Sequence, residues 1–149
     1  TGGPGERELT AAVRAAALRT VPGDAVLDLA GRTDLAGLAA VLDAAVCVVV
    51  GNTGPAHLAA AVGTPVVSLF SPVVPPERWA PYGVPVVLLG DQGAACRGSR
   101  ARDCPVPGHP CLSQVPPAAV LAAVEDLVRR PADAPAPVPA PEGGPRCAS

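Results

Sequence analysis

The sequence predicts an α/β protein built on a doubly wound parallel sheet. Short runs of apolar, often β-branched residues alternate with stretches of helical periodicity, and Gly and Pro separate the two kinds of segment. Alternating strands and helices place successive strands parallel to one another. Ligands of such sheets bind at the carboxyl ends of the strands, so the loops that follow the strands are the candidate sites.

The first part of the chain opens with a Gly-rich loop over residues 1–5, which resembles a loop whose preceding strand is missing. A helix is expected from about residue 6 to residue 19, with Leu9 and Val13 on its apolar face. A short strand is expected over residues 25–29, followed by the loop 30–33. A second helix should then run from Asp34 to about Ala44.

The central part of the chain is expected to form a strand, a loop, a helix and a strand. The apolar run 45–50 fits a buried parallel strand, and the small polar loop 51–54 follows it. Pro55 suits the first position of a helix and Gly63 its end. His57, Leu58, Ala61 and Val62 share one face of this helix. Another apolar run, 66–70, is the next strand.

The remaining segments are less regular. Residues 71–83 should form a loop with one helical turn, in which Arg78, Trp79 and Tyr82 either pack or rim a cleft. A strand over 84–89, an irregular segment over 90–115 and a last helix from 116 to about 130 complete one domain, residues 1–130. Residues 131–149 are rich in Pro and poor in apolar bulk, so we predict a disordered tail.

Composition limits the classes of partner. The net charge is −2 and the basic residues form no stripe, which argues against nucleic acid. No apolar run is long enough to span a bilayer, and no signal-peptide pattern opens the chain. We therefore expect at most peripheral contact with a membrane. No cofactor is predicted.

The loop 51–54 and the helix after it predict an anion site. The first backbone N–H groups of a helix lack partners, and its dipole places partial positive charge at the same end. His57 lies in the first turn, where helical side chains lean back toward the loop. Two interpretations stay open: a role for His57 toward a diphosphate, or a neutral imidazole that caps a loop carbonyl. Asn52, Thr53 and Gly54 can likewise bind phosphate or simply cap the helix.

The run Gly51-Asn52-Thr53-Gly54-Pro55-Ala56-His57 resembles the signature of glycosyltransferase family 9, which includes the ADP-heptose:lipopolysaccharide heptosyltransferases. The resemblance extends over about residues 1–130. The family most often has Asp where this chain has Asn52. The resemblance implies a Rossmann-like domain that forms the second half of a two-domain GT-B arrangement. This chain would then be an incomplete enzyme, lacking an N-terminal acceptor domain and the catalytic carboxylate carried there.

The resemblance also implies roles for individual residues. Asn52, Thr53, Gly54 and His57 would bind the diphosphate of a nucleoside-diphosphate sugar. Glu6 would hold the nucleotide ribose, although an exposed carboxylate in a first helical turn is equally compatible with the sequence. Gly31, Arg32 and Thr33 would lie beside the base, where Arg32 can stack or contact phosphate. The implied location is the cytoplasm, including the inner face of the plasma membrane.

Five cysteines form no paired framework. Cys47 falls in a predicted strand and Cys147 in the tail. Cys96, Cys104 and Cys111 share the irregular segment with His109, at spacings that differ from those of structural zinc sites. A single disulfide or three free thiols are the favoured alternatives, and no metal site is predicted.

The function expected from these observations is transfer of a heptose-like sugar from a nucleoside diphosphate to an acceptor hydroxyl, in synthesis of the cell envelope or a glycan. Two alternatives stay open. One is another GT-B-like nucleotide-sugar enzyme, such as an epimerase. The other is a non-catalytic module that binds a nucleotide.

Overall fold

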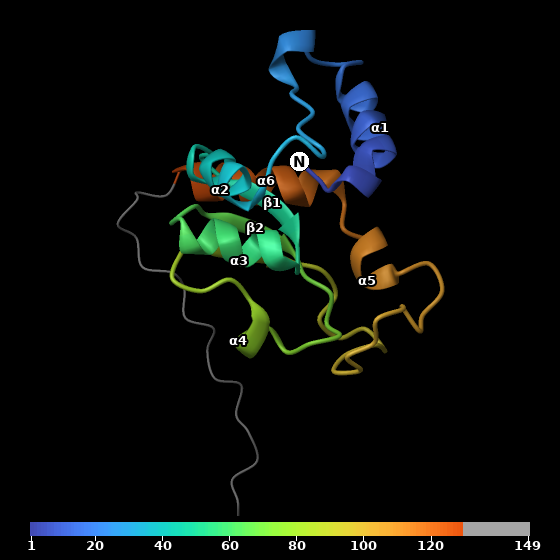
Figure 1. Cartoon of the computed structure of the whole chain (residues 1–149). Helices are drawn as coiled ribbons and strands as arrows, with labels where there is room; N and C mark the ends of the chain where they lie inside the picture. Colours follow the sequence, from blue (N-terminus) through green and yellow to red (C-terminus); the bar gives the residue numbers. More distant parts are fainter. Residues whose placement is uncertain (130–149) are drawn as a thin grey trace, which may run out of the picture. The chain divides into compact units, whose positions relative to one another are not determined.

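The computed structural model of the chain describes residues 1–129, and the predicted tail lies outside them. Within this range the chain divides into two compact units, Thr1–Ala44 and a second that begins at Ala45. Figure 1 shows the elements coloured in chain order. They are η1 (Pro4–Glu6), α1 (Arg7–Ala17), η2 (Gly23–Ala25) and α2 (Leu35–Asp43) in the first unit, and β1 (Val48–Gly51), α3 (Gly54–Ala61), β2 (Val66–Leu69), α4 (Pro76–Trp79), β3 (Val86–Leu89), α5 (Pro110–Ser113) and α6 (Pro117–Arg129) in the second.

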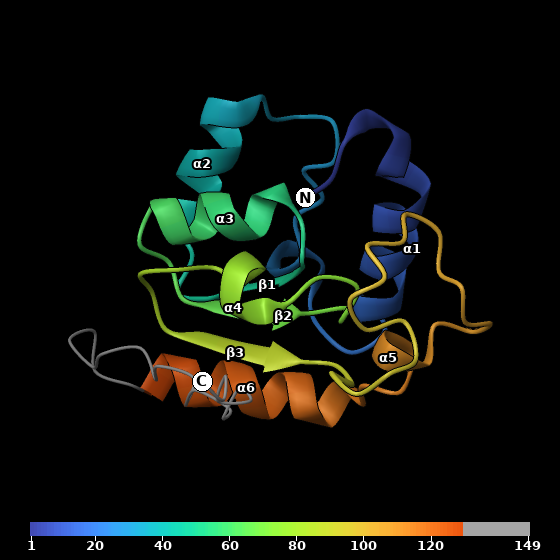
Figure 2. The same ribbon diagram turned by 90° about the horizontal axis from the view of Figure 1, so that it is seen from below.

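The second unit contains a parallel sheet in the order β1-β2-β3. Val48 lies opposite Val66, which in turn lies opposite Val86. Contacts join α3 to β1 and β2, and α6 to β2 and β3. Figure 2 shows the two helices on opposite faces of the sheet. The α/β class and the parallel orientation of these strands are therefore confirmed, with the bounds of the three strands shifted by up to three residues.

The core of this unit surrounds the central strand. Val66, Val67 and Phe70 are fully buried. Val67 packs against Ala123 and Leu127 of α6, which form the cluster on one face of the sheet. A middle strand covered on both faces is mostly apolar, and β2 is apolar except for the buried Ser68, which is why it was recognisable from the sequence.

Helix α3 presents a different face from the predicted one. Its buried residues are Ala56 and Ala59, whereas His57 and Ala61 are exposed. The methyl side chains of Ala56 and Ala59 allow the helix axis to approach the sheet closely, so the smallest apolar residues occupy the interface. This arrangement turns His57 outward. Gly63 follows the helix with φ +86°, the left-handed conformation expected of a glycine helix stop.

The predicted strand over residues 25–29 is wrong. Residues 23–25 form the turn η2 and the next four residues are irregular, although Val26 has extended angles. This segment is held by hydrogen bonds from side chains of α1, in place of the backbone hydrogen bonds that a neighbouring strand would supply. The Arg14 guanidinium donates to the carbonyl of Val26 at 3.2 Å, and the Thr10 hydroxyl donates to Asp28 Oδ2 at 3.1 Å. An extended segment without a ladder partner is not a strand.

The same contacts correct the predicted face of α1. Thr10 and Arg14 are half-buried, while Leu9 and Val13 are 64% and 62% exposed. The helix therefore turns a polar face to the segment 26–28, because that segment offers backbone carbonyls and a carboxylate to bond. Among residues 1–129, no helix has the length and apolar character that crossing a membrane requires.

Candidate functional site

The structure brings Asn52, Thr53, Gly54 and His57 together at the carboxyl end of β1 and the first turn of α3. Thr53 is the N-cap residue and has extended angles, φ −133° and ψ 175°. Its hydroxyl bonds back to the carbonyl of Gly51 at 3.4 Å, so this side chain does not cap the helix. Thr53, Gly54 and His57 are exposed. The N–H of Gly54 thus lies on an exposed surface beside an imidazole and a hydroxyl, whereas Pro55 has no N–H and the buried Ala56 donates its N–H to the Thr53 carbonyl at 3.0 Å.

Asn52 is held in a fixed orientation. Its side-chain oxygen Oδ1 accepts a hydrogen bond from the backbone N–H of Ser71 at 3.4 Å. Ser71 follows β2, so this bond links the ends of two neighbouring strands. This contact uses the amide oxygen, so the NH2 group of the same side chain takes no part in it. An NH2 group can only donate, which suits an anionic ligand.

Gly54 keeps this surface open. Its φ lies outside the left-handed region, and a Cβ placed on it would meet no atom within 4 Å. The backbone conformation therefore does not require glycine here, and neither does packing. Because glycine has no side chain, space is left at the N-terminus of the helix. A ligand can therefore approach the backbone N–H of Gly54 closely.

The predicted nucleotide-binding residues lie together in the first unit. The N–H of Gly31 donates to the carbonyl of Gly2 at 2.8 Å, which joins the loop 30–33 to the Gly-rich opening loop. The Arg7 guanidinium adds a bond to the Gly31 carbonyl at 3.4 Å. Gly31 has φ +65°, and a Cβ there would lie 2.9 Å from the Arg7 guanidinium and 3.2 Å from the Cα of Pro4. Both the positive φ and the lack of room for a Cβ require glycine at this position.

Glu6 is engaged within its own loop. Its carboxylate accepts the N–H of Gly3 at 2.6 Å. One oxygen of Glu6 therefore holds the opening loop in shape, and any bond to a ribose hydroxyl would use the other. Arg32 is exposed and Thr33 half-buried on the loop after Gly31.

Sequence reasoning missed Asp28, which fixes this loop. Asp28 Oδ1 accepts the N–H of Ala30 at 3.0 Å, and Oδ2 accepts the Thr10 hydroxyl. The backbone hydrogen bond from Ala30 is the main cause that lowers the pKa of the Asp28 carboxyl from its ordinary value. An Asp that bonds the backbone two residues on, before a Gly, is a recognisable turn signal. The signal was obscured because residues 25–29 fitted a strand.

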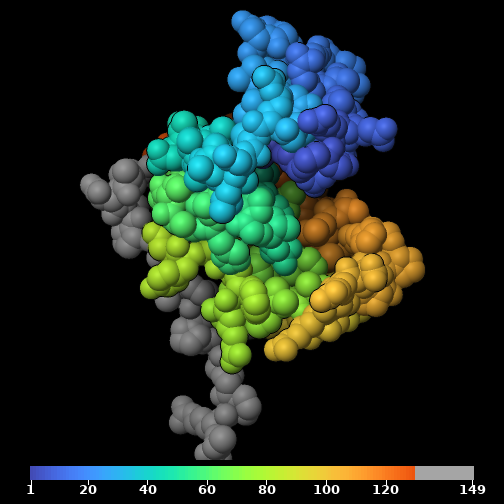
Figure 3. All heavy atoms as spheres, viewed as in Figure 1, coloured from blue at the N-terminus to red at the C-terminus, as the bar shows by residue number. Residues whose placement is uncertain are grey.

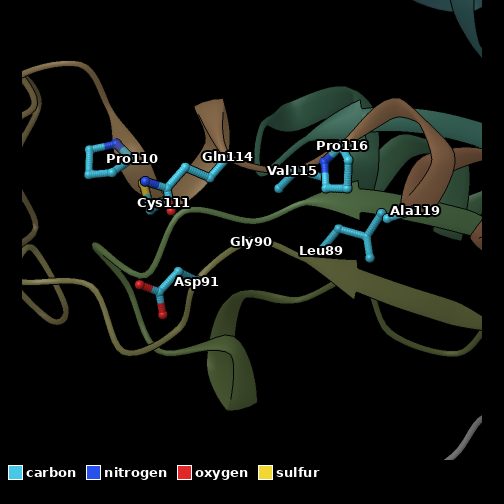
Figure 4. Close-up of a pocket in the computed structure, with 9 residues that line it drawn as sticks. All are labelled: Leu89, Gly90, Asp91, Pro110, Cys111, Gln114, Val115, Pro116 and Ala119. Atoms are coloured by element: carbon cyan, nitrogen blue, oxygen red, sulfur yellow. The ribbon is translucent and has the colours of Figure 1, made fainter.

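A hollow of about 300 Å³ lies at the carboxyl end of β3. It is lined by residues at the end of β3, by α5 and α6, and by the short loop that connects these two helices. In Figure 4, Leu89, Val115, Pro116 and Ala119 gather at one end and Asp91 lies at the other. Asn52 and His57 are not among its lining residues. The hollow is mostly apolar and separate from the predicted diphosphate site, and nothing in the sequence pattern indicated it.

Cys47, Cys96, Cys104 and Cys111 are free thiols. Across the described residues, no three His, Cys, Asp or Glu side chains are arranged to hold a metal ion. Trp79 and Tyr82, expected to pack or to rim a cleft, are 53% and 93% exposed. Their exposure contradicts the packing interpretation, since α4 ends at Trp79 and Tyr82 lies in the irregular stretch after it.

Comparison with known proteins identifies the family and supports the fold of the chain. The model of the family "Glycosyltransferase family 9 (heptosyltransferase)" matches residues 1–108. A solved structure of a family 9 glycosyl transferase from Veillonella parvula DSM 2008 superposes with a TM-score of 0.67 at 22% sequence identity. The match covers 85% of this chain and 35% of that one. Comparison with curated proteins gave no significant match. Because the family model covers well over half of its residues, this chain belongs to glycosyltransferase family 9.

Proposed function

We propose that this chain forms the donor-binding part of a glycosyltransferase that takes a heptose-like sugar from a nucleoside diphosphate. Membership of family 9 supports sugar transfer over the alternative of an epimerase. The chain spans 35% of the Veillonella structure, so the acceptor and the catalytic base are expected in a partner domain. The β1–α3 loop would bind the diphosphate, and Glu6 and residues 31–33 remain the candidates for contact with a nucleoside.

The observation that carries the proposal is the orientation of Asn52. Its oxygen is bonded to the N–H of Ser71, so its NH2 group is the end that can serve a ligand. The partial positive charge of the α3 N-terminus, the Thr53 hydroxyl and the exposed His57 imidazole lie in the same stretch. The NH2 group of Asn52, the N–H of Gly54 and the imidazole of His57 can donate hydrogen bonds to phosphate oxygens, and the Thr53 hydroxyl can do so by leaving the Gly51 carbonyl. Each would also stabilise the charge that develops on the leaving diphosphate.

Calorimetric titration of the full 149-residue chain with ADP, GDP, UDP and AMP tests the proposal. We expect binding of a diphosphate that is tighter than binding of the matching monophosphate. His57→Ala should weaken diphosphate binding about tenfold, because a hydrogen bond to a charged group is worth roughly 1.5–3 kcal/mol.

His109→Asn is the matched control for that variant. It removes the other imidazole of the chain at a residue with φ +50°, a conformation that Asn tolerates. We expect it to bind ADP as the parent does. Equal binding by His57→Ala and the parent, or no preference for diphosphate over monophosphate, would contradict the proposal.

A further inference from the structure

The walls of the hollow at the carboxyl end of β3 are held in place by the backbone. The N–H of Asp91, just after β3, donates to the carbonyl of Cys111 in α5 at 2.9 Å. Gly90 has φ +133°, and a Cβ there would lie 2.6 Å from the carbonyl oxygen of Phe70 and 3.2 Å from that of Cys111. Glycine therefore allows β3 and α5 to approach each other closely, and the hollow is preformed.

One end of the hollow is apolar. Leu89 packs against the core cluster on the α6 face of the sheet, and Val115, Pro116 and Ala119 lie at the same end in Figure 4. The methyl side chain of Ala119 leaves space beside Leu89 that a longer side chain would fill. A volume of about 300 Å³ is at the lower end of the range for ligand pockets, so the hollow suits a ligand with a single ring.

The other end of the hollow is acidic. In Figure 4, Cys111 and Gln114 lie on the same side as Asp91. Oδ1 of Asp91 accepts the N–H of Gly93 at 2.8 Å, and Oδ2 has no hydrogen-bond or ion-pair partner among the described residues. None of the lining residues that the structure describes is Lys, Arg or His. A ligand at this end would therefore meet a carboxylate and no cationic side chain.

The acidic end is also the open end. Asp91 and Gln114 are exposed, whereas Leu89 and Ala119 are half-buried. Gln114 belongs to the segment 90–115, whose yellow to orange atoms form a continuous part of the surface in Figure 3. A ligand with an apolar body and one polar group would thus enter with the apolar body inward and keep the polar group near water.

The start of α6 does not make the hollow an anion site. Pro116 and Pro117 have no N–H. The N–H groups of Ala119 and Val120 donate to the carbonyl of Pro116, at 2.9 and 3.4 Å. The helix start therefore offers few free donors to a ligand. An anion gains little here and is repelled by Asp91, whereas a cation is attracted.

We propose that the hollow binds a small apolar amine, with its hydrocarbon body against Leu89 and Ala119 and its ammonium group at Asp91. A primary amine is protonated at neutral pH, as the lysine side chain is. Its N–H groups can donate to the Asp91 carboxylate and to the side-chain oxygen of Gln114. Removal of the hydrocarbon body from water supplies most of the binding free energy. This site is distinct from the one proposed for the diphosphate.

Three cyclohexane derivatives that share a ring and differ in charge test the proposal. The ¹⁵N-labelled full chain is titrated at neutral pH with cyclohexylamine, cyclohexanol and cyclohexanecarboxylate, and the backbone amide signals are followed by NMR. We expect the amine to shift the signals of Gly90, Gln114 and Val115 saturably, with a Kd in the millimolar range for so small a ligand. The alcohol should bind about two- to fivefold more weakly, because an exposed ion pair contributes modestly, and the carboxylate more weakly still.

Equal affinities for the three ligands would overturn the choice of an amine. No saturable shift of these signals with the amine would overturn the site itself.

Two variants test the two ends of the hollow separately. Ala119→Leu fills the space beside Leu89 and should weaken binding of the amine about tenfold or more, since the ring loses its place. Ala122→Leu is the matched control, because Ala122 is exposed on the same helix, and it should bind the amine as the parent does. Asp91→Asn should bind the amine and the alcohol equally well.

Unchanged binding of the amine by Ala119→Leu, or a preference for the amine that persists in Asp91→Asn, would overturn the proposal. If Ala119→Leu fails to fold, the ranking of the three ligands in the parent and in Asp91→Asn decides.

A last arm separates this site from the proposed function. Cys111 lines the hollow, and its sulfur lies 3.9 Å from the hydroxyl oxygen of Ser71, whose N–H donates to Asn52. Asn52 itself is not a lining residue, so the amine should still bind to a chain saturated with ADP. Competition between the two ligands would overturn the claim of a distinct site. Binding of the amine without any binding of ADP would support this proposal and count against the proposed function alone.

Discussion

The backbone N–H of Ser71 donates a hydrogen bond to the side-chain oxygen of Asn52, across the carboxyl ends of β1 and β2. This bond engages the oxygen of the amide with the protein and leaves the NH2 group as the end that would serve the proposed ligand. It gives a physical reason for Asn at a position where similar signatures carry Asp. A carboxylate could accept the same N–H, but it would turn negative charge toward a diphosphate.

Asn52→Asp should therefore weaken ADP binding about tenfold while leaving Tm nearly unchanged. Binding of an ADP-sugar should fall less, since a carboxylate accepts hydrogen bonds from sugar hydroxyls well. Titration of the variant with ADP and with an ADP-sugar measures the two effects. A variant that binds ADP as tightly as the parent would show that the NH2 group of Asn52 does not contact the diphosphate.

Gly54→Val should separate ligand binding from folding. A Cβ at this position meets no atom within 4 Å, so the folded chain has room at the base of the added side chain and Tm should stay within a degree or two of the parent. The same side chain fills the space in front of the helix N-terminus, and diphosphate binding should fall at least tenfold. Binding that survives unchanged would place the ligand elsewhere.

The lowered pKa of Asp28 predicts how the stability of the first unit depends on pH. The folded state lowers the pKa of this carboxyl below its ordinary value of 3.8, chiefly through the hydrogen bond from the Ala30 N–H. A lowered pKa means that the folded state prefers the ionised form, so the stabilisation is present above pH 3.8 and is lost as pH falls below it.

Asp28→Asn keeps an acceptor for Ala30 and removes the charge. The parent should be the more stable of the two at pH 6, and its advantage in Tm should shrink toward pH 3. Thermal unfolding of both chains across this range makes the comparison. A constant difference in Tm from pH 6 to pH 3 would show that ionisation of Asp28 does not support the fold.

The interface of α3 with the sheet is tested by one matched pair of substitutions. Ala59 is fully buried, whereas Ala61 on the same helix is exposed. Ala59→Leu should overpack the interface and cost about 1–3 kcal/mol of unfolding free energy. Ala61→Leu should change it by no more than about 0.5 kcal/mol. Denaturant unfolding of the two variants measures the difference, and equal losses would mean that the buried face is assigned wrongly.

The central strand and the loops around it could be predicted from the sequence because their signals are local. Burial on both faces makes β2 apolar except at Ser68, and Gly63 marks the end of α3 through its own backbone conformation. The run 25–29 has a similar local appearance but forms no ladder, since a strand exists only where a neighbour supplies hydrogen bonds. That requirement is not contained in the run itself.

The residues of the site were predicted by type, and the contacts that orient them were not. Asn52 and His57 follow from the motif, but Ser71 lies nineteen residues beyond Asn52, and only the register of β1 against β2 brings the two together.

The claim that a diphosphate binds at the N-terminus of α3 is tested most directly by NMR titration of the ¹⁵N-labelled chain with ADP, and with adenosine as the control. The backbone amide signal of Gly54 and the side-chain NH2 signals of Asn52 should shift with ADP. With adenosine they should stay nearly unmoved, since adenosine lacks the phosphates that these groups would contact. Shifts confined to the hollow lined by Leu89, Gln114 and Val115, with Gly54 and Asn52 unmoved, would contradict the account.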